Sequence, residues 1–224
     1  MLTNVIFDMD GVVVDSHEAH IRTWKKLLLS LGKSVTDADL SFVRQGRKRR
    51  EILRFFLGEI PDDQVKAHCH VKDLLFRNEM QGIKMIPGVL ELLEDLKRAG
   101  VPVALATCGG GLRVHHLLLR LRIREYFAAV VTGDEVTFGK PDPEIFHKAA
   151  WQMHVHPAES LVFEDSISGI QGAKAAGMKC VGIADRHLAP ALVQAGADYV
   201  LPNFSGLSWI GIQKLFALSS QVLQ

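Results

Sequence analysis

The chain opens with a short apolar run, and the hydrophobic residues that follow it are spaced differently. Residues 4–7 (Asn-Val-Ile-Phe) are mostly branched or aromatic, which is typical of a strand buried on both faces. Between residues 17 and 31 the apolar residues fall on one face of a predicted helix, which ends at Gly32. Further helices are predicted at about 37–45, 47–57 and 62–81, and no stretch between 17 and 81 has the pattern of a strand.

The pattern changes after Pro87-Gly88, where helical and apolar stretches begin to alternate. The predicted strands lie at 101–106, 128–131, 161–163, 180–183 and 199–201. Helical stretches separate them near 111–122, 142–153, 167–176 and 188–195. Strands that alternate with helices form a parallel sheet through right-handed crossovers. We therefore predict an α/β core of residues 1–14 and 85–224, with an all-helical cap of residues 15–84 inserted after the first strand.

Composition narrows the class of protein. The 224 residues are 48 % hydrophobic and 23 % charged, which is usual for a globular protein and excludes disorder. The 26 basic and 25 acidic residues leave a net charge of +1, so the surface as a whole is not suited to nucleic acid or acidic lipid. The three cysteines lack the spacing of a zinc site or a disulfide framework, which favours reduced thiols and a cytoplasmic location. Asp8 and Asp10 interrupt the apolar start, so neither a signal peptide nor a membrane span is expected.

Polar and charged residues follow several of the predicted strands. Asp8 and Asp10 come after the first strand, and Thr107 with three glycines comes after the second. Glu164 and Asp165 follow the strand at 161–163, while Lys140 precedes a helix. Ligands of open α/β sheets bind at the carboxyl ends of the strands. We therefore expect these side chains to share one edge of the sheet.

Four carboxylates at one edge would repel one another, and removing each from water costs several kcal/mol. A bound cation resolves this repulsion. Carboxylate oxygens without histidine or cysteine partners favour Mg²⁺ over zinc. Asp8 and Asp10 are two residues apart, so in an extended backbone their side chains leave on the same side. Asp8 is then suited to nucleophilic attack, because its carboxylate is ionised at neutral pH, and Asp10 is free to move a proton.

The remaining groups favour phosphate. The Thr107 hydroxyl and the amides of Cys108 and Gly109 are suited to phosphate oxygens, and Lys140 adds a positive charge. Each feature alone has an ordinary structural explanation, such as a turn, a flexible loop, a surface lysine or a helix start. Their joint occurrence in order at strand ends indicates phosphoryl transfer.

The same residues resemble the haloacid dehalogenase superfamily, and the likeness extends over essentially the whole chain. The motifs that carry it are Asp8-Met9-Asp10-Gly11-Val12, Thr107, Lys140-Pro141-Asp142-Pro143, and Glu164-Asp165-Ser166 with Gly169-Ile170. The resemblance implies a Rossmann-like parallel sheet with an inserted helical cap. It also implies that Asp8 forms an aspartyl-phosphate, that Asp10 is the general acid and base, that Thr107 holds phosphate and that Lys140 neutralises the nucleophile and the transferring group.

The resemblance further implies the metal site. Mg²⁺ would be bound by Asp8, by the backbone carbonyl of Asp10 and by Asp165, with Glu164 binding directly or through water. The sequence does not decide whether the Lys140-Pro141 peptide bond is cis or trans.

The predicted cap resembles the subgroup that includes β-phosphoglucomutase and sugar-phosphate phosphatases. His20, Trp24 and Lys25 match it in their spacing from Asp10, and Gly46 with Arg49 matches its cap segment, where the arginine binds the non-transferring phosphate. His20, Gly46 and Arg49 are therefore candidate substrate-binding residues. His20 also has a plain alternative as a surface or packing histidine.

The loop after Thr107 departs from the mutase pattern. It reads Cys-Gly-Gly-Gly, where the mutase has a serine-rich stretch with a lysine. The loss of that cation argues against tight binding of a bisphosphate. The basic run Arg47-Lys48-Arg49-Arg50 also resembles a nucleic-acid patch, although consecutive helical residues point around the axis. A solvated helix face and a phosphate clamp through Arg49 are the other two interpretations.

Taken together, these features predict a cytoplasmic, Mg²⁺-dependent phosphatase that hydrolyses a small phosphate monoester, most simply a sugar phosphate, through an aspartyl-phosphate. One alternative is β-phosphoglucomutase, which shares the first half-reaction and passes the phosphoryl group to a sugar hydroxyl instead of water. Another is a non-catalytic phosphate-binding regulatory protein, against which the intact Asp8 and Asp10 argue. The expected partner is a small phosphorylated metabolite, with no nucleic acid or membrane, and the expected state is a monomer or weak dimer.

Overall fold

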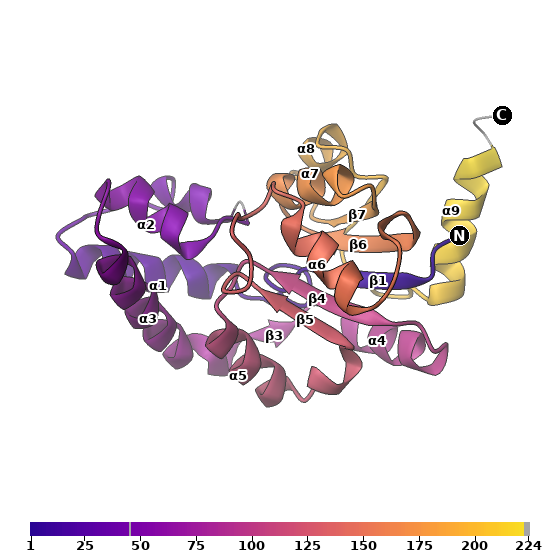
Figure 1. Ribbon diagram of the computed structural model, residues 1–224, viewed down its shortest axis with the longest axis horizontal. Coiled ribbons are helices and arrows are strands. Elements are labelled where there is room, and N and C mark those ends of the chain that lie inside the picture. Colours follow the sequence, from indigo (N-terminus) through magenta and orange to yellow (C-terminus); the bar gives the residue numbers. More distant parts are fainter. Residues whose placement is uncertain (45, 222–224) are drawn as a thin grey trace.

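A six-stranded parallel sheet forms the centre of the computed structural model, which describes residues 1–44 and 46–221 (Figure 1). The strand order is β5-β4-β1-β6-β7-β8. The strands are β1 (Asn4–Phe7), β4 (Val103–Thr107), β5 (Ala129–Thr132), β6 (Ser160–Glu164), β7 (Lys179–Ile183) and β8 (Tyr199–Leu201). β1 is central, with Val5 opposite Val103 on one side and Leu161 on the other. The predicted α/β fold is confirmed.

Helices cover both faces of this sheet. Val5 and Phe7 point to one face and pack with α4 (Val89–Arg98), α5 (Gly111–Leu121) and α9 (Trp209–Gln221). Ile6 points to the other face, which α6 (Glu144–Gln152), α7 (Ile167–Ala175) and α8 (Ala189–Gln194) cover. Because strand residues alternate between two apolar environments, the strands read as continuous hydrophobic runs.

Residues 15–84, between β1 and α4, make up the proposed cap. Its helices are α1 (His17–Ser30), α2 (Arg49–Leu57) and α3 (Asp62–Glu79), with a 3₁₀ helix η1 (Asp39–Arg44). They share a hydrophobic cluster of their own, which includes Trp24, Leu28 and Leu53. A second 3₁₀ helix, η2 (Met80–Gly82), follows α3. The 3₁₀ helices η3 (Arg124–Tyr126) and η4 (Pro157–Glu159) lie outside the cap, in the core. The separate cluster supports the division into a core of residues 1–14 and 85–224 and a cap of residues 15–84, which we retain as a proposal.

A short antiparallel ribbon joins the two parts. It pairs β2 (Val14–Asp15) with β3 (Lys84–Met85), so the chain leaves and re-enters the core at one place. The hydrophobic pattern does not predict this ribbon, because two-residue strands are too short to show a period. It also misses α9, whose apolar residues occur on all sides of the helix. The predicted helix at 37–45 is the 3₁₀ helix η1, and residue 45 itself lies outside the described residues. Within the described ranges, no helix is both long and apolar enough to cross a membrane.

Gly88 allows the chain to pass from the ribbon into α4. It has a φ of +81°, and a Cβ at this position would lie 2.3 Å from the carbonyl carbon of Phe204. Gly100 has a similar φ of +67°, but a Cβ there would meet nothing within 4 Å. A side chain at Gly100 would therefore add backbone strain alone, whereas one at Gly88 would add the same strain and a clash with backbone atoms.

We expect Gly100→Ala to lower the free energy of unfolding by about 1 kcal/mol, because it adds only left-handed strain. Gly88→Ala should cost about 3 kcal/mol, because overpacking against the Phe204 backbone adds to that strain. Urea denaturation of both variants beside the parent protein measures the difference. Equal losses for the two variants would contradict the proposed close approach.

Candidate active site

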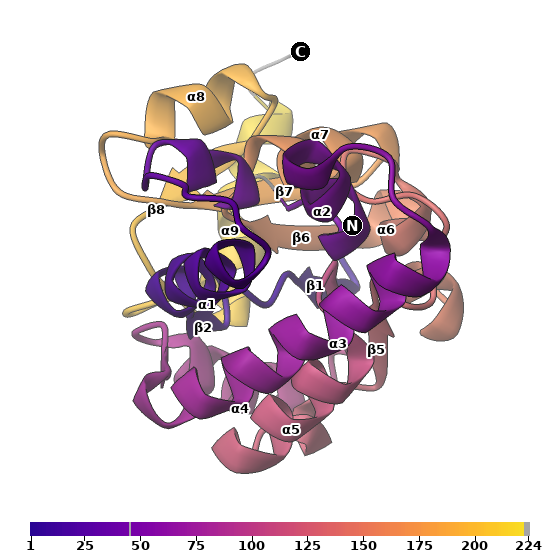
Figure 2. The same ribbon diagram turned by 90° about the vertical axis from the view of Figure 1, so that its left-hand side faces the viewer.

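The predicted site residues gather at the carboxyl edge of the sheet, beneath the cap. Figure 2 shows α1, α2 and α3 lying in front of this edge. A cavity of about 70 Å³ lies between cap and core. The predicted site residues that line it are Asp8, Asp10, His20, Gly46, Arg49, Thr107, Cys108, Gly109 and Asp165. Lys140 and Glu164 do not line it and lie behind Asp8.

Lys140 joins the Asp8 motif to the Glu164-Asp165 motif through a buried cluster of ion pairs. Its side chain is 1 % exposed, and its Nζ donates to Asp8 Oδ1 at 2.5 Å, to Glu164 Oε1 and to the Ala106 carbonyl at 3.2 Å. Burial alone would lower the pKa of Lys140, but Asp8 and Glu164 outweigh it and hold that pKa well above its ordinary value. Lys140 is therefore a permanent cation against the proposed nucleophile. The peptide bond that follows it, to Pro141, is cis.

Glu164 is turned away from the cavity. Its Oε1 accepts from Lys140, and its Oε2 accepts from the backbone amides of Asp165 and Ser166 and from the Ser166 hydroxyl. A Cβ at Gly169 would lie 1.9 Å from its carboxyl carbon, so the helix start packs directly against it. Both oxygens therefore have partners within the protein. The resemblance implies that Glu164 binds the metal directly or through water, and this geometry also makes it the support of Lys140 and of the Asp165 loop.

Asp10 is held by three side chains. Arg113 Nη1 and Nη2 donate to its two oxygens at 2.9 and 2.6 Å, and the Ser16 hydroxyl donates to Oδ1 at 2.6 Å. His20 Nε2 lies 3.1 Å from the same Oδ1. Burial alone would raise the pKa of Asp10, but Arg113 and His20 outweigh it and hold that pKa well below its usual range. Asp10 is therefore a carboxylate in this arrangement.

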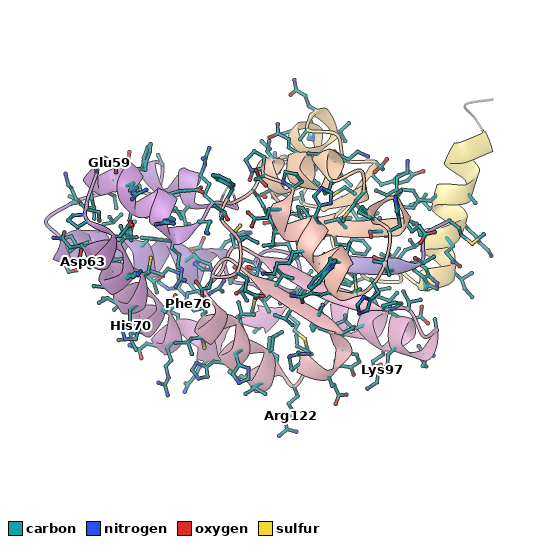
Figure 3. All side chains as sticks on the ribbon, viewed as in Figure 1. Glu59, Asp63, His70, Phe76, Lys97 and Arg122 are labelled. Atoms are coloured by element: carbon teal, nitrogen blue, oxygen red, sulfur yellow. The ribbon has the colours of Figure 1, made fainter. Side chains whose placement is uncertain are left out.

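Arg113 was not predicted from the sequence, although it donates hydrogen bonds to both carboxylate oxygens of Asp10. It comes from α5, and its guanidinium lies 4.9 Å from the ring centre of Phe76 on α3, which Figure 3 labels. The glycine run after Thr107 leaves space for its side chain. A Cβ at Gly109 would lie 2.0 Å from Arg113 Nη2, and one at Gly110 would lie 2.4 Å from Arg49 Nη2.

The glycine run therefore makes room for two arginines as well as for a ligand. Two of its amides are also used within the protein, because the amide of Gly109 donates to Thr107 Oγ1 at 3.0 Å and that of Gly111 to Asp134 Oδ2 at 2.7 Å. The loop provides fewer amides for phosphate than its composition indicated.

His20 connects Asp10 to a second buried lysine, Lys72. Lys72 Nζ donates to His20 Nδ1 at 2.7 Å, which leaves the imidazole proton on Nε2, facing Asp10. Burial lowers the pKa of His20 to about 3, with Lys72 adding to the effect, so the ring is neutral. Burial and Arg113 lower the pKa of Lys72 as well. Lys72 also lies over the ring of Phe76 at 4.6 Å, and sequence analysis gave no indication of it.

The basic run does not form one surface. Arg49 binds Asp73 of α3 and, at 2.7 Å, Asp134 of the core. Lys48 Nζ donates to the carbonyls of Val136 and Thr137 at 2.5 and 3.3 Å. Arg50 pairs with Asp62 within the cap. These side chains tie the cap to itself and to the core, which argues against a nucleic-acid patch.

The donor set at the cavity floor fits a divalent cation. Burial raises the pKa of Asp8 well above its ordinary value, and the nearby Glu164 and Asp165 carboxylates add to this shift against Lys140. A Cβ at Gly11 would lie 2.0 Å from Asp165 Oδ2, so only glycine leaves room for that carboxylate. Among the described residues, no group of three or more His, Cys, Asp or Glu side chains is arranged to hold a metal ion by itself.

Comparison with known proteins decides the family. The haloacid dehalogenase-like hydrolase family matches residues 5–183, which include every motif described above. The chain belongs to this family. The resemblance found in the sequence is therefore confirmed.

Relatives of this haloacid dehalogenase-like hydrolase cover most of its length. A phosphorylated carbohydrates phosphatase from Thermotoga maritima is 36 % identical over 199 residues, which are 86 % of this chain and 91 % of that protein. The beta-phosphoglucomutase of Bacillus subtilis is 31 % identical over 213 residues, or 91 % of each chain. The crystal structure of CbbY from Rhodobacter sphaeroides in complex with phosphate has a TM-score of 0.84 at 27 % identity, covering 95 % of this chain and all of that one. The family and these relatives place the chain among enzymes that act on phosphate esters.

We expect Arg113→Lys to lower kcat about tenfold and to change KM by less than twofold. A single ammonium cannot make the two parallel hydrogen bonds that orient the Asp10 carboxylate, and a small misplacement of a catalytic group is costly. Steady-state phosphate release measures both constants. Arg122→Lys, an exposed exchange just beyond the same helix, is the control and should behave as the parent. An unchanged kcat for a folded Arg113→Lys protein would show that Arg113 does not position Asp10.

Proposed function

We propose that the protein is a Mg²⁺-dependent phosphatase that hydrolyses a phosphorylated carbohydrate through an aspartyl-phosphate on Asp8. The observation that carries this proposal is the position of Asp8, held by Lys140 at the floor of the cavity, with Asp10 beside it. The Thermotoga maritima relative is a phosphorylated carbohydrates phosphatase, and others act on glycerol 3-phosphate and hexitol phosphate.

The first half of the reaction uses Asp8 as nucleophile. A carboxylate oxygen of Asp8 attacks phosphorus, and the bond from phosphorus to the leaving-group oxygen breaks. The leaving oxygen takes up a proton through Asp10, which Arg113 and His20 hold as a carboxylate and which therefore first accepts that proton from the substrate monoanion or from water. Lys140 offsets the negative charge that the carboxylate and the phosphoryl group bring together, and Thr107 lies at the cavity wall to bind a phosphoryl oxygen.

The second half releases phosphate. Water attacks phosphorus, the bond between phosphorus and the Asp8 oxygen breaks, and Asp10 removes the proton of the water. Arg113 holds Asp10 as a carboxylate, which is the form that this step requires. The cap residues His20, Arg49 and Lys72 line this cavity together with the core residues.

Mg²⁺ would be held by the carboxylates of Asp8 and Asp165 and by the backbone carbonyl of Asp10. When bound, it neutralises the charge of the phosphoryl oxygens and of the carboxylates around them. His17 Nε2 lies 2.7 Å from Asp165 Oδ2 and positions that carboxylate.

Phosphomutase activity is the second candidate function. The connection from Lys72 through His20 to Asp10 favours it, because it links a cap side chain that would contact the substrate to the group that moves the proton. The Bacillus subtilis relative is a beta-phosphoglucomutase. The glycine loop without lysine favours hydrolysis, since less positive charge is available there for a bisphosphate.

We place the enzyme in the cytoplasm as a monomer or weak dimer, acting on a small phosphorylated metabolite without nucleic acid or membrane partners. The near-neutral net charge and the internal pairing of the basic run support this assignment.

Asp8→Asn should lower kcat for any phosphate monoester at least 1,000-fold, because the amide has almost the same shape but is no nucleophile. Asp63→Asn, an exposed exchange at the start of α3, should leave kcat unchanged. Phosphate release measures both. Activity retained in Asp8→Asn would assign the reaction to another residue.

Chelation by EDTA should abolish turnover, and added Mg²⁺ should restore it. Asp165→Asn should raise the Mg²⁺ concentration for half-maximal rate roughly tenfold or more, because one anionic ligand is lost. A magnesium titration of the rate measures this shift, with Asp63→Asn as the control. The same Mg²⁺ requirement in parent and Asp165→Asn would exclude Asp165 as a ligand.

A phosphorus NMR time course separates the two candidate functions. The protein is mixed with β-glucose 1-phosphate, Mg²⁺ and a trace of β-glucose 1,6-bisphosphate. We expect inorganic phosphate as the product. Accumulation of glucose 6-phosphate without inorganic phosphate would make the enzyme a mutase.

A further inference from the structure

The loop that follows β5 carries a carboxylate with partners in both parts of the molecule. Asp134 Oδ1 accepts from Arg49 Nη2 at 2.7 Å, and its Oδ2 accepts from the backbone amide of Gly111 at 2.7 Å. Arg49 is the first residue of α2 in the proposed cap, whereas Gly111 is the first residue of α5 in the core. The Asp134 side chain therefore joins the start of a cap helix to the start of a core helix.

Helix α5 begins without a capping side chain of its own. Its N-cap residue is Gly110, and no acidic residue lies in its first turn. The free amides at the start of a helix need acceptors, and a carboxylate there also complements the helix dipole. Asp134 supplies both the acceptor and the charge from the loop after β5. The amide of Gly133 donates to the carbonyl of Gly109 at 2.9 Å, which holds the two loops together.

The first turn of α5 also carries Arg113, which donates to both oxygens of Asp10. The Arg113 side chain is 1 % exposed. Its guanidinium fits closely against the loop before the helix, since a Cβ at Gly109 would lie 2.0 Å from Arg113 Nη2. A shift of this turn would therefore move the donors that orient Asp10.

Arg49 fixes Asp134 relative to the cap. Its side chain is 16 % exposed, and its Nη1 binds Asp73 of α3, so the guanidinium lies between a cap carboxylate and a core carboxylate. A Cβ at Gly110 would lie 2.4 Å from Arg49 Nη2, so the guanidinium also rests on the loop that precedes α5. The planar guanidinium presents its donors in a rigid fork, which gives the link a defined geometry.

We propose that Asp134 is a positioning residue for proton transfer. With the cap seated on the core, Arg49 and Asp134 fix the first turn of α5. Arg113 in that turn then orients the Asp10 carboxylate. Asp134 does not line the cavity at the active site, so it acts through these residues and not on the substrate. The inference rests on the proposed phosphatase function and links the seating of the cap to the proton-transfer step.

The leaving group of the substrate tests this role. An alkoxide needs a proton as it leaves, whereas p-nitrophenolate leaves without one, so only the alkyl ester depends on proton delivery through Asp10. We measure kcat/KM for phosphate release from glycerol 3-phosphate and from p-nitrophenyl phosphate in the presence of Mg²⁺. Asp134→Ala should lower the value for glycerol 3-phosphate about fivefold and that for p-nitrophenyl phosphate less than twofold. Equal losses for the two esters would overturn the positioning role.

Asp134→Asn separates the two contacts of this side chain. The amide oxygen can still accept from the Gly111 amide, but the amide nitrogen cannot accept from Arg49. If the cap contact matters, this variant should lose at least threefold in kcat/KM for glycerol 3-phosphate. A value equal to that of the parent would overturn the link to the cap.

Glu135 of the same loop provides the matched control. Its carboxylate accepts from the amide and the hydroxyl of Thr132 and pairs with Lys148, all within the core. Glu135→Gln should change neither kcat/KM value. Circular dichroism establishes that each variant is folded.

A double-mutant cycle tests whether Asp134 acts through Arg113. If it does, adding Asp134→Ala to Arg113→Lys should lower kcat/KM for glycerol 3-phosphate by less than a further twofold. A loss equal to the product of the two single losses would show that Asp134 acts independently and would overturn the proposal. Hydrolysis of neither ester by the unmodified enzyme would overturn the phosphatase function, and this inference with it.

Discussion

The buried cation of Lys140 is the constraint on which the rest of the site depends. Transfer of an ammonium group from water into a protein interior costs several kcal/mol, and only close carboxylates return that cost. Asp8 follows β1 and Glu164 ends β6, so the lysine fixes two neighbouring strand ends relative to the loop before α6. Removal of either carboxylate would leave an uncompensated charge. The pairing that positions the nucleophile is therefore also a pairing that the folded core cannot easily lose.

Asp10 shows how the cap takes part in the chemistry. Its partners come from both sides of the cavity, with His20 on α1 and Arg113 on α5. Arg113 in turn lies over Phe76 of α3, and Lys72 of α3 binds His20. Movement of the cap would change the two contacts that cross between cap and core, that of His20 with Asp10 and that of Arg113 with Phe76. The position of the proton-transfer group is thus coupled to closure over the substrate, whichever acceptor receives the phosphoryl group.

Much of the fold was predictable because the information is local. Apolar runs that alternate with helices gave the parallel sheet, and residues at strand ends share an edge whatever the details of packing. Arg113 was not predictable in this way, since it is 103 residues from Asp10 and one basic residue among many. Lys72 lies on a cap helix whose sequence gives no reason for a buried cation. Glu164 shows the limit most clearly, because its place in the sequence suits a metal ligand and only the folded chain turns it toward Lys140.

The central claim is that Asp8, prepared by Lys140, becomes phosphorylated during turnover. Rapid quenching of the working enzyme, followed by borohydride reduction, converts an acyl phosphate of aspartate to homoserine. Peptide mass spectrometry then identifies the modified position. The account predicts homoserine at position 8, only when substrate and Mg²⁺ are both present, and none at Asp10 or Asp165. Turnover without any modification at Asp8, or with modification at another carboxylate, would contradict it.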